Sequence, residues 1–216
     1  MARHIYREKK KEIAERVFRM GIQANDALRK ALHAFAEGDL ELARKVRQDD
    51  ASIDRLQEEI DRTILTFIAI EQPVAHDLTE LFASVKIVVE LERLADHAAH
   101  IARVALRLSR RPPEPVLETV SRMGTLCAEM LEDAMSAFLA RDTAAATETA
   151  SRDDEVDRLH TRLIEELLGG REEYGLSDTM QLLYTALYLE RIGDHVTNIC
   201  EWILYGANAE AIRLNE

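Results

Sequence analysis

Carboxylate side chains recur four residues apart at four places in the sequence, a spacing that could serve metal binding. The four pairs are Asp50 with Asp54, Glu92 with Asp96, Asp153 with Asp157, and Glu190 with Asp194. On a helix, residues four apart project from one face, so each pair presents its oxygen atoms side by side. Oxygen ligands suit hard cations such as Mg²⁺, Mn²⁺ and Ca²⁺, and also iron.

Two of these pairs lie on or beside the apolar stripe of their predicted helix. With a rotation of about 100° per residue, Glu92 and Asp96 share a face with Leu81, Val85 and Val88. Glu190 and Asp194 repeat this placement. Half-buried carboxylates without a counter-charge are unfavourable, so protons, arginines or cations must neutralise them. If arginines do so, the candidates are Arg55, Arg93, Arg158 and Arg191; if cations do so, the candidate additional ligands are His100, His160, Asn198 and Glu201.

The chain is an internal repeat, and the repeat brings the carboxylate pairs into register. The stretch 19–21 (Arg-Met-Gly) recurs at 122–124, and 91–93 (Leu-Glu-Arg) recurs at 189–191. Duplication over most of the chain predicts two domains, 1–111 and 112–216. A proline-rich stretch at 110–115 separates them, since proline ends one helix and can start the next.

Long stretches without proline predict three helices in each half. The predicted spans are 4–36, 39–70 and 77–109 in the first half and 116–140, 142–168 and 178–206 in the second. Gly38 and Asp39 mark the first helix boundary, and Asp77 with Glu80 has the spacing of a capping box. Short turns force neighbouring helices to run antiparallel, so the predicted fold is all-α: two repeated three-helix bundles with six helices.

Composition excludes several classes of protein. The 216 residues include only 8 Gly and 4 Pro, too few turn residues for an all-β fold. A net charge of −12 disfavours nucleic acid as a partner, although Arg7–Lys11 forms a small basic patch. The chain has no apolar run long enough to span a membrane and no apolar signal core, so we expect a cytoplasmic protein without direct membrane insertion. Cys127 and Cys200 are expected to be buried, reduced thiols.

Three segments resemble the PhoU family of bacterial phosphate-uptake regulators. They are 189–199 (Leu-Glu-Arg-Ile-Gly-Asp-His-Val-Thr-Asn-Ile), 91–97 (Leu-Glu-Arg-Leu-Ala-Asp-His) and 72–78 (Gln-Pro-Val-Ala-His-Asp-Leu). The resemblance covers essentially the whole chain, including the duplication and the linker. It implies two three-helix bundles, each able to hold a multinuclear metal cluster. The ligand roles that it carries over fall on Asp50, Asp54, Glu92, Asp96, Asp153, Asp157, Glu190 and Asp194.

The resemblance also implies a function and partners. It implies a negative regulator of phosphate transport and of the phosphate-starvation response, which contacts the ATPase subunit of the phosphate ABC transporter and a membrane sensor histidine kinase. Such a protein would be a non-enzymatic adaptor, recruited to the inner membrane only through its partners. We also expect a homodimer. The metal identity, divalent or iron, is not set by a carboxylate-rich site.

Two positions depart from the family pattern, and both bear on function. Thr79 stands where the family often has arginine, which puts a role for that arginine in doubt. Arg103 stands where the second half has Glu201, so the two clusters are expected to differ in charge and in metal number.

Two other functions compete with the regulatory reading. The first is a carboxylate-bridged di-metal enzyme, because Asp157 and His160 have the spacing of a Glu-x-x-His motif. That architecture needs a second copy of the motif, and Gln57 stands where the second histidine would be. The other alternative is a purely structural helical bundle whose charged edges are only solvated.

Overall fold

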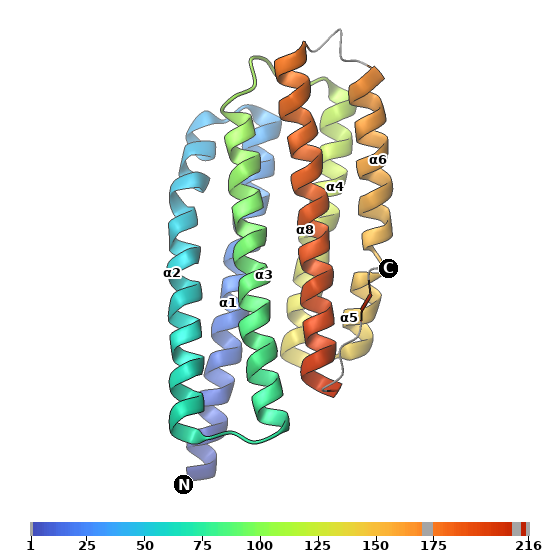
Figure 1. Ribbon diagram of the computed structural model, residues 1–216. Helices are drawn as coiled ribbons and strands as arrows, with labels where there is room; N and C mark the ends of the chain where they lie inside the picture. Colours follow the sequence, from blue (N-terminus) through green and yellow to red (C-terminus); the bar gives the residue numbers. More distant parts are fainter. Residues whose placement is uncertain (1, 170–174, 209–212, 215–216) are drawn as a thin grey trace.

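The computed structural model describes residues 2–169, 175–208 and 213–214, and its regular elements in these ranges are all helices (Figure 1). They are α1 (Ala2–Glu37), α2 (Leu40–Glu71), α3 (His76–Ala105), α4 (Glu114–Ala140), α5 (Thr143–Ala150), α6 (Asp153–Gly169) and α8 (Leu176–Asn208). The predicted all-α, six-helix fold is confirmed, with one refinement. The fifth predicted helix is interrupted at Ser151 and Arg152 and forms α5 and α6.

The helix boundary at Gly38 and Asp39 is as predicted. Gly38 has a φ of 68°, a left-handed conformation that glycine adopts without strain. The Asp39 side chain then caps α2 by accepting a hydrogen bond from the backbone N–H of Leu42 at 2.9 Å. Asp142, the repeat counterpart of Asp39, caps α5 in the same way.

The predicted capping box at Asp77 and Glu80 is wrong. The residue before α3 is Ala75, and no side chain caps this helix. Asp77 instead accepts a hydrogen bond from the Tyr6 hydroxyl at 2.8 Å and pairs with Lys10 of α1. These partners lie far away in the sequence, so local spacing could not reveal them.

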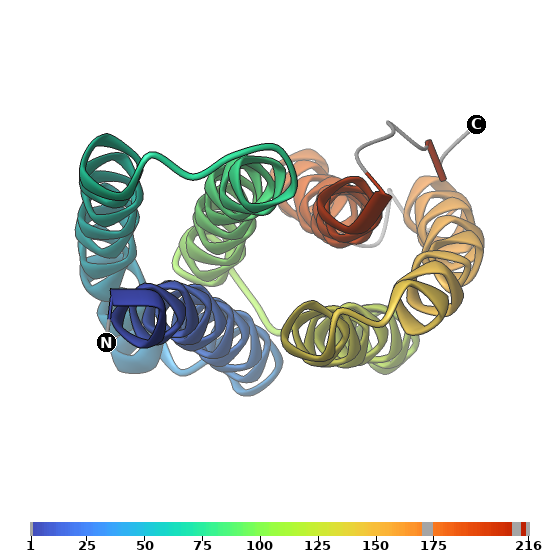
Figure 2. The same cartoon turned by 90° about the horizontal axis from the view of Figure 1, so that it is seen from below.

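The helices form two bundles that lie side by side. One contains α1, α2 and α3, and the other contains α4, α5, α6 and α8, as the view along the helices shows (Figure 2). The most extensive packing between helices joins α3 to α8 at the centre, and α1 packs against α4. A single core of buried apolar side chains therefore runs through both halves of the repeat.

Small side chains allow α3 and α8 to approach closely at the centre. A Cβ atom added at Gly206 on α8 would lie only 3.1 Å from the Cβ atom of Ala83 on α3. Cys127 and Cys200 are both buried and free, as predicted, and burial raises the pKa of each thiol.

Within the described ranges, no helix combines the length and apolar character needed to cross a bilayer.

Candidate metal centre

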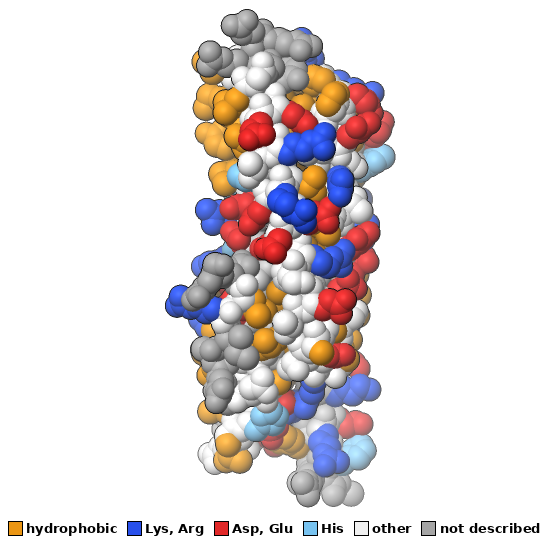
Figure 3. All heavy atoms as spheres, turned by 90° about the vertical axis from the view of Figure 1, so that its right-hand side faces the viewer, with side chains coloured by type: hydrophobic (Ala, Val, Ile, Leu, Met, Phe, Trp, Pro, Cys, Tyr) orange, Lys and Arg blue, Asp and Glu red, His pale blue; other side chains and the backbone are white. Residues whose placement is uncertain are grey.

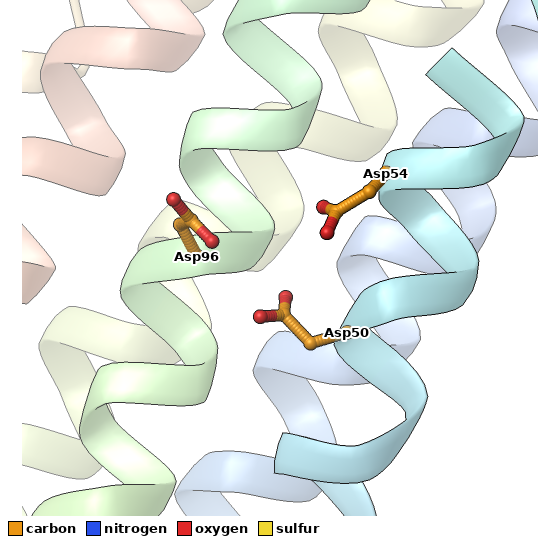
Figure 4. Close-up of side chains that lie close together, drawn as sticks. All are labelled: Asp50, Asp54 and Asp96. Carbon is orange, nitrogen blue, oxygen red and sulfur yellow. The ribbon is translucent and has the colours of Figure 1, made fainter. Parts of the chain in front are cut away.

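Three carboxylates of the first half converge between α2 and α3. Asp50 and Asp54 project from successive turns of α2 toward Asp96 on α3 (Figure 4). One oxygen from each of the three lies within 4.8 Å of the others. Asp54 is exposed and the other two are half-buried, so the cluster sits at the surface and is open to solvent.

Glu92 adds a fourth negative charge to this cluster. It is half-buried one turn before Asp96 on α3. Burial raises the pKa of Glu92, and the neighbouring Asp96, Asp54 and Asp50 raise it further. Burial likewise raises the pKa of Asp50 to about 6, with repulsion from Asp96 and Asp54 adding to the effect. Burial and the neighbouring negative charges therefore both favour the protonated form of these carboxyl groups.

No arginine closes this cluster with an ion pair. Within the described ranges, Asp50, Asp54, Glu92 and Asp96 form no salt bridge with any basic side chain. Arg103 is near enough to lower the pKa of Asp50 but does not pair with it.

A histidine near the cluster also has an unsatisfied nitrogen. Among the described residues, none hydrogen-bonds to the buried Nδ1 atom of His100, which lies close to Asp96. An oxygen-rich, incompletely neutralised set of this kind fits a hard cation. Of the four first-half residues predicted as ligands, Asp50, Asp54 and Asp96 are brought together in a set whose oxygen atoms would fit a hard cation, and Glu92 lies beside them.

The second half places its equivalent acids differently. Asp153, the counterpart of Asp50, is only 5% exposed and accepts a hydrogen bond from the Thr197 hydroxyl at 3.2 Å. Gly193 makes this position accessible, since a Cβ atom there would lie 2.4 Å from Oδ1 of Asp153. Asp153 is thus turned beneath α8 and away from the surface position that Asp50 takes.

An arginine neutralises two of the other acids of the second half, Glu190 and Asp194. Arg191 lies 3.4 Å from Glu190 and 3.3 Å from Asp194. Burial still raises the pKa of both carboxyl groups, while Arg191 lowers it. Among the described residues, Asp153, Asp157, Glu190 and Asp194 do not form a group with oxygen atoms within 4.8 Å of one another, as the three acids of the first half do.

Charges of both signs alternate on the surrounding surface of the second half. The face that carries α5 and α6 shows acidic and basic side chains side by side (Figure 3). Arg152 bridges Glu129 at 2.8 Å and Asp133 at 2.7 Å, and Arg122 pairs with Glu155. In this half, arginine pairing is the common way in which carboxylates are neutralised.

Comparison with known proteins agrees with the repeat and the fold. The PhoU domain family matches residues 17–105 and again residues 120–203. The chain belongs to the PhoU family. It is 34% identical over 219 residues, covering 100% of both chains, to a Clostridium acetobutylicum protein named "Phosphate-specific transport system accessory protein PhoU homolog". A Caulobacter vibrioides protein with the same name is 36% identical over 214 residues, 96% of this chain and 91% of the relative.

Solved PhoU structures have the same architecture. The crystal structure of the phosphate transport system regulatory protein PhoU from Streptococcus pneumoniae superposes with a TM-score of 0.90 at 28% identity, covering 96% of this chain and 99% of the other. PhoU from Pseudomonas aeruginosa gives a TM-score of 0.89 at 28% identity, covering 95% and 100%.

A polar cluster between the two halves of this PhoU chain was not predicted. Nδ1 of His195 lies 2.7 Å from Oε2 of the buried Glu90, and Asn198 donates to the same oxygen at 3.2 Å. The rings of His97 and His195 stack at 5.3 Å. By helical rotation Glu90 shares an arc with Lys86 and Arg93, opposite the apolar stripe, so the sequence predicts an exposed side chain. That prediction is wrong, because Glu90 is buried against α8.

Two of the candidate additional ligands are engaged elsewhere. Asn198 is held by Glu90, and Glu201 accepts a hydrogen bond from the backbone N–H of Leu214 at 2.7 Å. His160 remains near Glu190, where it lowers the pKa of that carboxyl group.

Proposed function

We propose that this protein is a negative regulator of phosphate uptake and of the phosphate-starvation response. It acts as a metal-binding, non-enzymatic adaptor between the ATPase subunit of a phosphate ABC transporter and a sensor histidine kinase, on the cytoplasmic side of the membrane. The observation that carries the proposal is membership of the PhoU family along both halves of the chain, with relatives named as accessory proteins of phosphate-specific transport.

The carboxylate cluster supplies the chemistry of the adaptor surface. Asp50, Asp54 and Asp96 would hold a hard cation, with Glu92 alongside. Such a cation, when bound, supplies positive charge and open coordination positions at the surface. Without a cation, the four side chains present a strongly negative patch between α2 and α3. A partner that carries carboxylates would therefore meet a different surface in the two states.

The second half would form a weaker site from Asp153, Asp157, Glu190 and Asp194. Arg191 already neutralises two of these acids, and Asp153 is held by Thr197. A cation would have to displace these contacts before binding. We therefore propose two unequal sites on two repeat units, 1–111 and 112–216, in a chain that forms a homodimer.

A transporter pull-down tests the adaptor role. The purified ATPase subunit of the phosphate transporter is used to capture the parent protein and the triple variant Asp50→Asn, Asp54→Asn and Asp96→Asn, with Mn²⁺ and with chelator. Glu41→Gln, an exposed acid at the start of α2, is the matched control. We expect capture of the parent and the control to depend on the metal. If neither the chelator nor the triple substitution changes the amount captured, the proposal of a metal-dependent adaptor is refuted.

A deletion strain tests the regulatory role separately. Loss of the gene, together with any paralogue, is expected to derepress phosphate-starvation genes at high phosphate, as measured with a reporter. Normal repression in that strain would show that this chain is not a negative regulator.

A further inference from the structure

A cavity of about 820 Å³ opens at one end of the molecule, between the starts of α1 and α3 and the ends of α4 and α8. None of the carboxylates of the two acidic clusters lines it. Its volume lies in the range of small-molecule sites. The cavity is therefore a second concave feature, separate from the candidate metal centre.

The walls of the cavity are mainly apolar. The large apolar side chains that line it are Leu81, Ile87, Phe138, Leu139, Trp202 and Ile203. Trp202 is held in place from outside, with its ring edge-on to Phe82 at 6.0 Å and to Tyr205 at 5.6 Å. Two small residues, Ala14 on α1 and Ala207 on α8, leave space between the walls. A rigid aromatic wall and small neighbours suit an apolar ligand body.

The acids at the mouth are already neutralised. The Glu80 carboxylate forms ion pairs with Lys10 at 2.5 Å and Arg141 at 2.7 Å, and it lies 2.9 Å from the His76 ring. Asp77 also pairs with Lys10. Glu15, the other acidic residue that the structure describes in the lining, contacts Lys11 at 3.5 Å, so each of these carboxylates has a basic neighbour.

One cation at the mouth remains available. Arg7 is exposed, lines the cavity, and has no hydrogen bond or ion pair in the part of the chain that the structure describes. It belongs to the small basic patch at Arg7–Lys11 that the sequence singles out in an otherwise acidic chain. Lys11, next to it, is 78% exposed and makes only a loose contact of 3.5 Å with Glu15.

The opposite end of the repeat is arranged differently. Asp178, the counterpart of Glu80, accepts hydrogen bonds from the backbone N–H of Ser109 at 3.1 Å and from its hydroxyl at 2.5 Å. Pro112 in the same linker is buried. The linker between α3 and α4 thus covers the end of the molecule that corresponds to the cavity.

We propose that the cavity binds a small amphipathic anion. An aliphatic or aromatic body would fill the apolar walls, with a carboxylate or phosphate group beside Arg7. This inference does not depend on the proposed regulatory function or on metal binding. Free fatty-acid-like anions and membrane phospholipids share this chemistry, and the experiment must distinguish them.

Contact quenching of Trp202 tests the proposal in the unmodified protein. Trp202 is the sole tryptophan of the sequence and lines the cavity, so its fluorescence reports on a ligand bound beside it. The probe is 11-bromoundecanoate below its micelle concentration, since bromine quenches only on contact, and undecanoate is the unbrominated control. We expect saturable quenching by the brominated acid that undecanoate reverses by competition. Absence of saturable quenching would overturn the proposal.

Variants locate the binding. Ala14→Phe and Ala207→Phe fill the cavity from opposite walls and should weaken binding at least about tenfold. Ala69→Phe adds the same ring at an exposed position of α2, outside the cavity, and should leave binding unchanged. Arg7→Gln should weaken binding about twofold to fivefold, and Arg44→Gln, also exposed on α2, should not.

The remaining outcomes separate the two sources of the anion. Helical content and thermal melts identify any variant that does not fold. If neither filled variant folds, saturable quenching of the parent alone tests whether the anion binds. Binding of the folded filled variants with parental affinity would overturn the proposal. So would binding to phosphatidylcholine vesicles containing phosphatidylglycerol without binding of free 11-bromoundecanoate, since the anion would then be recognised only on a membrane surface.

Discussion

The two halves of the repeat carry the same four carboxylate positions but use them differently. In the first half, Asp50, Asp54 and Asp96 face one another at the surface, and no basic side chain of the described ranges forms an ion pair with them. In the second half, Asp153 is buried and Arg191 neutralises Glu190 and Asp194. Equal spacing of acids therefore does not guarantee equal sites.

The difference arises from residues one helical turn away from the acids. Gly193 and Thr197 on α8 provide space and a hydroxyl donor for Asp153. The corresponding residues on α3 are Ala95 and Ala99, which offer neither. Asp50 has no polar partner beneath α3 and so lies with the other acids at the surface.

The largest expected effect is stabilisation by metal at the first cluster. At a hundredfold excess of metal over Kd, binding should add about 2.7 kcal/mol to the free energy of unfolding. Asp96→Asn should lose most of this gain, whereas Asp194→Asn should keep most of it. With chelator, Asp96→Asn should melt at or above the parent, because one repelling charge is gone.

Thermal melts of the parent and both variants, each with Mn²⁺ and with chelator, measure this difference. If Asp96→Asn is equally destabilised under both conditions, Asp96 has a structural partner and no metal role.

Gly193→Ala should destabilise the second half by about 1–3 kcal/mol. The added Cβ would lie 2.4 Å from Oδ1 of Asp153 and 3.2 Å from Val156, so α6 must move away from α8. Ala95→Gly, the reverse change at the repeat counterpart, should cost only about 1 kcal/mol through helix propensity. Urea unfolding measures both, and a neutral Gly193→Ala would show that the close approach does not hold Asp153.

Arg191→Gln should make the second cluster more like the first. Removing a nearby positive charge should strengthen Mn²⁺ binding there roughly fivefold to tenfold. Stability without metal should change by less than about 1 kcal/mol, because Arg191 is exposed. Arg93→Gln, the exposed counterpart in the repeat, is the matched control and should leave Mn²⁺ binding at the second cluster unchanged, because Arg93 lies beside Glu92 of the first cluster. An unchanged Mn²⁺ affinity of Arg191→Gln would show that the buried Asp153 alone weakens the second site.

The smallest expected effect is a pH dependence of the metal-free protein. The folded-state pKa of Asp50, about 6, lies above its ordinary value of 3.8. The folded state therefore holds a proton that the unfolded chain releases, and stability should rise as pH falls through 6 toward 4. The gain should be several tenths of a kcal/mol, because Asp50 is half-exposed and screened.

Denaturant unfolding with chelator at pH 7 and pH 5 measures this gain by comparing the parent with Asp50→Asn. The parent should gain more than the variant on acidification. An identical gain in both proteins would mean that protonation of Asp50 does not cause the pH dependence.

The sequence could predict the helices, the duplication and the meeting of Asp50, Asp54 and Asp96, because these depend on local spacing. The sequence also contains the residues that distinguish the two halves. The second half has Gly193 and Thr197 where the first half has Ala95 and Ala99. The misassigned capping box at Asp77 shows what local spacing misses. That carboxylate pairs with a lysine on another helix, and only the packed fold brings such partners together.

Direct Mn²⁺ binding tests the central claim, that the first cluster is the stronger metal site. Equilibrium dialysis compares the parent with Asp54→Asn and with Asp157→Asn, which are counterparts in the repeat. We predict that Asp54→Asn weakens the tightest site at least about tenfold and that Asp157→Asn leaves it intact. Equal loss in the two variants, or no loss in either, would contradict the account.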